Sequence, residues 1–198
     1  MKLSQSTHRR PLMGLALVVL LLPACGLNSV VDSDEDVKAA WAEVESQYKR
    51  RADLVPNLVQ TVRGAANFEQ STLVQVTQAR ARATGITVDG ASVADPAKLR
   101  AFEAAQQQLS GALSRLLVAS ERYPELRATA SFQDLQAQLE GTENRITVAR
   151  RRFIDSVASY NKVVLRFPTL IGARLRGMAV RPSFSGIPGQ ENPPEIKF

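Results

Sequence analysis

The chain has 198 residues, room for one ordinary domain, and carries 25 basic and 19 acidic residues. Three basic residues and the only histidine, His8, precede residue 25, which leaves 22 basic against 19 acidic residues, a formal net charge of +3. Residues 25–198 therefore lack the strong positive charge typical of nucleic-acid-binding proteins, and they exclude histidine catalysis and the usual zinc sites.

The N-terminus has the features of a lipoprotein signal peptide. Lys2, Arg9 and Arg10 make a positive start, and residues 12–22 follow without a polar side chain. This apolar run is too short for a membrane-spanning helix, which needs about 20 residues. Because small or apolar residues directly precede Cys25, as in a lipobox, we expect cleavage before Cys25 and lipid attachment to its thiol. Plain secretion and an uncleaved membrane anchor are the alternatives.

The first helix is predicted to begin after a short lipidated tether at residues 25–32. Ser33 and Asp36 form a capping box, which is typical of a helix start. Apolar residues then recur at three- and four-residue steps to about Ala83, which predicts one long helix. We expect a kink near Pro56, because proline removes a backbone donor from the helix.

Two further helices complete the predicted bundle. Residues 85–94 have no helical period and indicate a loop, after which Asp95 before Pro96 predicts the start of the second helix. Ser131 with Asp134 forms another capping box at the start of the third helix. Each helix has one apolar stripe and no strand is predicted, so the expected fold is an all-α, antiparallel, up-down-up bundle of three long helices.

The end of the chain is predicted to be less regular. Residues 169–180 form a short apolar piece with arginines that could cap the bundle, and the prolines and glycines after them indicate an extended tail. The expected organisation is a signal peptide at 1–24, a tether at 25–32, a helical bundle at 33–181 and a flexible tail at 182–198.

No pattern in the sequence predicts catalysis. Glu140 and Glu143 lie on neighbouring turns, as on many solvated helix faces, and no glycine-rich phosphate loop or Ser-x-x-Lys spacing is present. We therefore expect no enzyme activity, no cofactor and no metal ion. A hydrolase that uses carboxylates alone is the remaining enzymatic alternative.

Four charged residues fall on or near the apolar stripes: Arg51, Glu69, Glu143 and Arg150. We interpret them as a polar layer within the bundle that fixes the register of the helices through buried pairs, with a ligand site as the alternative. In an up-down-up bundle the first and third helices run parallel. We expect Glu143 to lie at a similar depth to Arg51 and to pair with it.

The stretch from Ser156 to Gln190 contains no acidic residue. Its five cations are Lys162, Arg166, Arg174, Arg176 and Arg181. In an upright three-helix bundle this end would lie far from the N-terminal anchor and could contact an anionic surface, such as cell-wall polymer or an opposing membrane. A solvated basic helix end is the alternative, since cations also favour a helix C-terminus.

Several segments resemble the LemA family. They are KRRADLVPNLV at 49–59, YPEL at 123–126, FQDL at 132–135 and LEGTENRI at 139–146. The resemblance spans about residues 37–182 and implies an all-helical bundle held at a membrane by an N-terminal segment, with no established biochemical activity. Most members use an N-terminal transmembrane helix, in place of which this chain has its lipobox.

The sequence as a whole predicts a non-enzymatic lipoprotein of the bacterial cell envelope. We expect a helical scaffold or adaptor that binds protein partners or self-associates, faces the periplasm and binds no nucleic acid. Gly26 differs from the aspartate that retains enteric lipoproteins at the inner membrane, which by analogy favours the outer membrane where two membranes exist.

Overall fold

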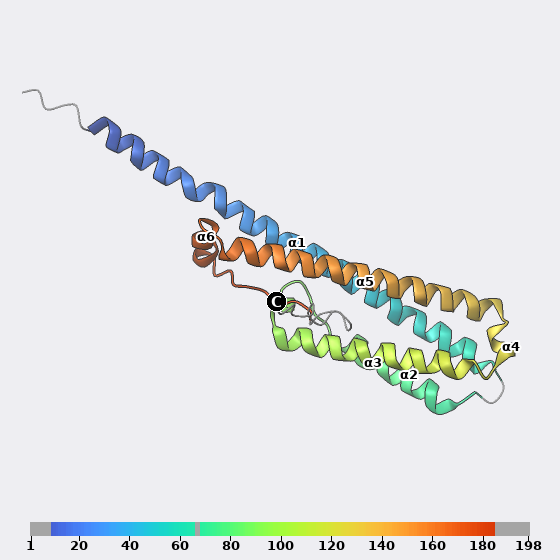
Figure 1. The fold of residues 1–198 in the computed structure, drawn as a ribbon. Coiled ribbons are helices and arrows are strands. Elements are labelled where there is room, and N and C mark those ends of the chain that lie inside the picture. The colour runs from blue at the N-terminus through green and yellow to red at the C-terminus, as the bar shows by residue number, and fades with distance from the viewer. Residues whose placement is uncertain (1–8, 66–67, 185–198) are drawn as a thin grey trace, which may run out of the picture.

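In the computed structural model the protein is a helical bundle (Figure 1). The structure describes residues 9–65 and 68–184, and for residues 9–27 it describes the backbone alone. Its longer helices are α1 (Arg9–Arg63), α2 (Gln70–Gly85), α3 (Pro96–Ser120) and α5 (Ala130–Leu165). Its short helices are η1 (Ser92–Ala94), α4 (Pro124–Arg127) and α6 (Thr169–Leu175). The described residues contain no strand, and the predicted all-α fold class is confirmed.

The four longer helices alternate in direction. Trp41 of α1 contacts Phe153 of α5, and Arg51 further along α1 contacts Glu143, so residue numbers rise along α1 as they fall along α5. These two helices are therefore antiparallel. Figure 1 shows them side by side, with α2 and α3 as a second antiparallel pair. The bundle is up-down-up-down.

The predicted first helix is two helices, and this part of the prediction was wrong. The chain leaves α1 after Arg63 and reverses direction before α2 begins at Gln70. Val62 and Leu73 are both buried, and the eleven residue steps from one to the other equal about three helical turns. The apolar stripe therefore stays in phase across the break, which is why periodicity alone did not reveal it.

Pro56 lies inside α1, where the helix continues without a break. A proline at this position cannot donate to the carbonyl of Ala52, four residues earlier. That carbonyl instead accepts a hydrogen bond of 2.8 Å from Nε of Arg80, which lies on α2. The side chain of Arg80 thus replaces the missing backbone donor and also fastens α2 to α1.

The predicted helix start at Ser33 was also wrong, because α1 begins at Arg9 and runs through the expected tether. Ser33 does not cap the helix. Its hydroxyl donates to the carbonyl of Val30 at 3.0 Å, and Val30 itself is fully buried. By contrast, the start predicted at Asp95 is confirmed, since its carboxylate accepts from the backbone N–H of Ala97 at 2.8 Å.

Within the described residues, no helix is long and apolar enough to cross a membrane.

The core divides into two clusters of different composition. The cluster nearer the N-terminal half of α1 is rich in aromatic rings, which pack edge to face around Trp41. The cluster nearer the C-terminal end of α1 is aliphatic and centres on Leu58, Leu109 and Leu116. Arg51 lies between them, because the first cluster ends at Tyr48 along α1 and the second begins at Leu54.

The segment after α6 returns along the bundle instead of leaving it. Tyr160 donates to the carbonyl of Ala179 at 3.0 Å, and burial raises the pKa of this phenol above its ordinary value. The side-chain amide of Asn161 accepts a hydrogen bond from the backbone N–H of Arg181 at 2.8 Å and donates one to the carbonyl of Arg181 at 3.0 Å. Phe184 is 5% exposed and packs on Trp41 and Phe153, so the bundle continues past the expected boundary at 181. The rest of the expected tail, 185–198, lies outside the described residues.

Candidate functional site

A polar layer crosses the middle of the bundle around Arg51, which is 1% exposed. One terminal nitrogen, Nη1, donates to Ser110 Oγ at 2.6 Å and to Glu143 Oε2 at 3.0 Å. The other, Nη2, donates to the side-chain oxygen of Gln106 at 2.7 Å and to its carbonyl at 3.1 Å. Acceptors from α3 and α5 therefore surround a guanidinium carried by α1. We call this group, with Tyr48, Glu103 and Arg150, the Arg51 layer.

Arg150 extends the Arg51 layer toward the aromatic cluster. Its guanidinium donates to the Tyr48 hydroxyl at 3.1 Å and to Glu103 at 3.2 Å, and it lies 4.0 Å from the centre of the Phe184 ring. The Tyr48 ring in turn faces Arg51 at 5.0 Å. Two cations and two carboxylates thus balance one another, and Tyr48 connects the two arginines.

The pairing of Arg51 with Glu143 has a different origin from the one expected. The two residues meet although α1 and α5 are antiparallel, because the reversal after Arg63 adds one more helix before α5. The prediction that their helices run parallel was wrong. Glu103, Gln106 and Ser110 were not predicted as members of the layer. Their signal was present, since they interrupt the apolar stripe of α3 at helical spacing.

Glu69 does not belong to the Arg51 layer. It precedes α2 at the end of the bundle and forms an ion pair of 2.7 Å with Arg122, with its side chain 44% exposed. The sequence placed it on the stripe only because α1 and α2 were read as one helix.

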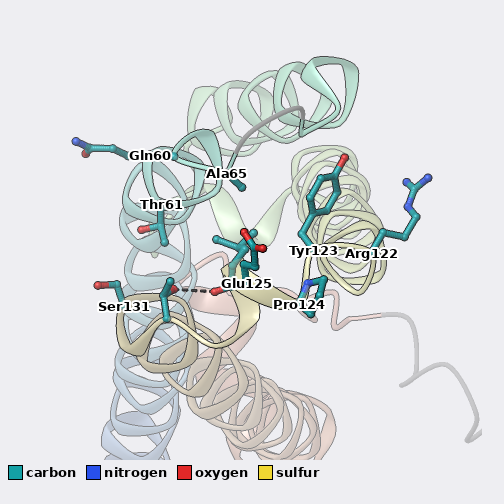
Figure 2. Close-up of a pocket in the computed structure, with 11 residues that line it drawn as sticks. Gln60, Thr61, Ala65, Arg122, Tyr123, Pro124, Glu125 and Ser131 are labelled. Atoms are coloured by element: carbon teal, nitrogen blue, oxygen red, sulfur yellow. Dashed lines mark hydrogen bonds between the residues drawn. The ribbon is translucent and has the colours of Figure 1, made fainter.

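A second feature, an open cleft of about 820 Å³, lies at the end of the bundle where α1 terminates. It is bordered by residues 60–65 of the α1 end and by residues 122–131 of the turn that leads through α4 into α5. Figure 2 shows Glu125 in the middle of the opening, between Thr61 and Tyr123.

The cleft has an apolar base and a polar border. Leu126 is buried beneath it, and the ring of Tyr123 packs on Phe68 at 5.0 Å. The turn is held by Thr129, whose hydroxyl donates to the carbonyl of Leu126 at 2.7 Å (Figure 2). Glu125 is exposed and forms no ion pair with any residue that the structure describes. Such a surface can receive an apolar segment and a basic group together.

The model of the LemA family matches residues 40–198 of this chain. The chain belongs to the LemA family. It is 24% identical over 142 residues to protein LemA of Metamycoplasma hominis, a match that covers 72% of this chain and 61% of the relative. The chain therefore spans less than two thirds of that relative's length. The predicted family resemblance is confirmed.

The segments that resemble the LemA family gather at the two features described above. Segments 49–59 and 139–146 face each other across the Arg51 layer, to which they contribute Arg51 and Glu143. Segment 123–126 forms the turn beneath the cleft. Close beside it, segment 132–135 supplies the buried Phe132 and Leu135 to the aliphatic core.

The predicted basic surface lies at the opposite end of this LemA family bundle from where it was expected. Because α5 is antiparallel to α1, the end of α5 and all of α6 lie beside the N-terminal part of α1 (Figure 1). Lys162, Arg166, Arg174 and Arg176 are exposed. Arg181 is not: its side chain is 11% exposed and pairs with Asp34 at 2.7 Å.

The remaining predicted sites are of a different kind. Cys25 is part of α1, where the structure describes its backbone but not its side chain. Across residues 9–65 and 68–184, no three His, Cys, Asp or Glu side chains gather closely enough to hold a metal ion.

Proposed function

We propose that this protein is a membrane-attached helical adaptor of the bacterial cell envelope, which binds a protein partner in the cleft around Glu125. Two or three acyl chains carried by Cys25 provide the attachment, since one chain alone binds a membrane only weakly. The adaptor faces the periplasm and, where the envelope has two membranes, is held at the outer one.

The observation that carries this proposal is the position of the cleft. The N-terminal part of α1 extends from one end of the bundle, and the cleft opens at the other (Figures 1 and 2). The 33 helical steps from Val30 to Arg63 correspond to about 50 Å. A bundle attached through its N-terminus therefore presents the cleft well above the lipid surface.

The composition of the cleft favours binding over catalysis. The residues that line it include hydroxyls and one carboxylate, but no histidine or lysine to activate a nucleophile and no cysteine to act as one. The exposed Pro124 and the half-buried Tyr123 offer apolar contact, and Glu125 offers one negative charge. This combination suits an apolar protein segment that carries an arginine or lysine.

The Arg51 layer supports this role indirectly. It joins α1, α3 and α5 near mid-height through hydrogen bonds that place each helix in one register. A bundle in a fixed register holds the two segments that border the cleft, residues 60–65 and 122–131, in a fixed arrangement. An adaptor needs such rigidity, because it must hold its partner at a defined distance from the membrane.

Photo-crosslinking in cells tests partner binding. A benzoylphenylalanine at Gln60, on the border of the cleft, is compared with one at Asn144, which is also exposed and lies on α5. We expect a crosslinked protein, identified by mass spectrometry, at Gln60 alone, and we expect Glu125→Arg to abolish it. A crosslink between two copies of the chain would identify self-association as the role. Equal yields at both positions, or none, would contradict the proposal.

Attachment has its own test. Cells fed an alkyne analogue of palmitate should label the wild-type protein and not the Cys25→Ser variant. Equal labelling of the two proteins would exclude Cys25 as the lipidated residue.

A further inference from the structure

The end of the bundle beside the N-terminal part of α1 carries an unusual concentration of exposed apolar side chains. Leu165, Phe167, Ile171 and Leu175 are 63%, 76%, 50% and 80% exposed. The described part of the chain has eight large exposed hydrophobic residues, and these four of them fall within the eleven residues 165–175. On α6, Ile171 and Leu175 are four residues apart and share a face, while Gly172 and Ala173 are turned into the bundle.

Four exposed cations lie on the same segments as these apolar residues. Lys162 and Arg166 lie at the end of α5, and Arg174 and Arg176 at the end of α6. We call the four apolar and four basic residues together the basal surface. Arg181 is not part of it, because it pairs with Asp34 and donates to the carbonyl of Gly90 at 3.3 Å.

Acidic residues of α1 are the groups that could oppose this charge. Asp34 is engaged by both Arg181 and Lys38, and Glu35 also pairs with Lys38. The contact of Trp41 with Phe153 sets the register of the two helices and places Asp32 level with Lys162. The other acids of α1 lie deeper along the bundle than Asp32. Beyond the level shared by Asp32 and Lys162, the described part of α1 therefore offers no acid to oppose Arg166, Arg174 and Arg176.

The basal surface lies where α1 leaves the bundle (Figure 1). Cys25 precedes the buried Val30 by five residues of continuous helix, a rise of about 8 Å. The headgroup region of one leaflet is about 5–8 Å thick. A lipid chain on Cys25, or an uncleaved apolar segment before it, therefore brings α6 to the level of the lipid headgroups.

We infer that the basal surface docks on the anionic lipid headgroups of the same membrane to which the N-terminus is attached. Ile171 and Leu175 enter the boundary between headgroups and acyl chains, and the arginines beside them contact lipid phosphates while their aliphatic stems stay in the apolar layer. Docking fixes the bundle upright on its membrane. This inference rests on the proposed membrane attachment.

The test uses the full-length protein purified from the membranes of the cells that produce it, with benzoylphenylalanine at Leu175, reconstituted into vesicles. Val118, on α3 near the opposite end, is the matched control because it is 64% exposed and also apolar. We expect lipid adducts at position 175 and not at position 118. Yields should be higher with phosphatidylglycerol mixed into phosphatidylcholine than with phosphatidylcholine alone.

Charge removal gives a second readout. Each cation near an anionic surface contributes about a fivefold factor, so Arg174→Gln with Arg176→Gln should lower the ratio of docked to undocked protein about 30-fold. The same change at the exposed pair Arg151 and Arg152, in the middle of α5, should leave the adducts at position 175 unchanged.

The outcomes separate the two proposals. If the protein floats with the vesicles but gives no lipid adduct at position 175, docking is overturned and attachment stands. Adducts in cells to a protein instead of lipid at this position would assign the basal surface to a protein partner and overturn docking. A protein that does not float with vesicles at all would overturn both.

Discussion

Replacing Arg51 by methionine should destabilise the protein far more than removing the charge of its partner Glu143. Arg51 is 2% exposed in its side chain, whereas that of Glu143 is 52% exposed. Methionine has a similar length but no donor, so Arg51→Met leaves the oxygens of Gln106 and Ser110 without the donors that now reach them. A buried acceptor that loses its partner costs about 1–3 kcal/mol.

These numbers give an asymmetric expectation. Arg51→Met should lower the free energy of unfolding by about 3 kcal/mol, since Gln106 is buried and Ser110 is partly buried. Glu143→Gln should cost less than about 1 kcal/mol, because an ion pair with one exposed partner is screened by solvent. The coupling between the two substitutions should also stay near or below about 1 kcal/mol.

Circular dichroism during thermal unfolding of the full-length protein in mild detergent measures these effects. For a chain of this size, a loss of 3 kcal/mol lowers Tm by about 6–12 °C. The control is Arg50→Met on the same helix, where the arginine is exposed and the change should stay within about 0.5 kcal/mol. A Glu143→Gln variant as unstable as Arg51→Met, or an Arg51→Met variant as stable as the wild type, would refute this reasoning.

Three further substitutions test other contacts by the same measurement. Arg80→Ala should lower the free energy of unfolding by about 1–2 kcal/mol in the wild type. The loss should be clearly smaller in a Pro56→Ala background, because there the helix regains its backbone donor to Ala52. Equal losses in both backgrounds would show that Arg80 does not replace the donor that Pro56 lacks. Arg181→Met should cost about 1–3 kcal/mol because it leaves the buried Asp34 with one partner fewer, whereas Arg176→Met should be neutral. Phe184→Ala should cost about 3 kcal/mol if the segment after α6 belongs to the core, and a neutral result would place it outside.

Sequence reasoning predicted the helical class of the fold because apolar periodicity and capping are local signals. At Asp95 and Pro96, for example, the aspartate side chain caps the helix and the proline ring fixes the backbone of its first residue, and both effects act within a few residues. The reversal between α1 and α2 has no such signal, since the stripe remains in phase from Val62 to Leu73. That single missed turn also inverted the predicted relation of the basic region to the N-terminus.

The candidate site was predicted in part for a related reason. A charged residue on an apolar stripe, such as Arg51, must find partners inside the bundle, and its sequence position reveals this need. Which residues become the partners of Arg51 depends on the packing of α3 against α1 and α5, and no local sequence pattern determines this packing. The cleft around Glu125 was not foreseen, because it forms where two segments far apart in the sequence, residues 60–65 and 122–131, meet at one end of the bundle.

The most direct test of the account measures how the bundle stands on its membrane. Cysteines introduced at Gln60 and, separately, at Ser159 carry a fluorophore that reports its distance from an acceptor dye in the lipid surface. Cys25 is the one native cysteine, and in the proposed attachment its thiol carries lipid and does not react with the dye. Helical rise from Cys25 predicts about 50 Å for Gln60 and about 15 Å for Ser159, which lies level with Glu35. Equal energy transfer from the two positions would mean that the bundle lies flat or is unattached, and would contradict the account.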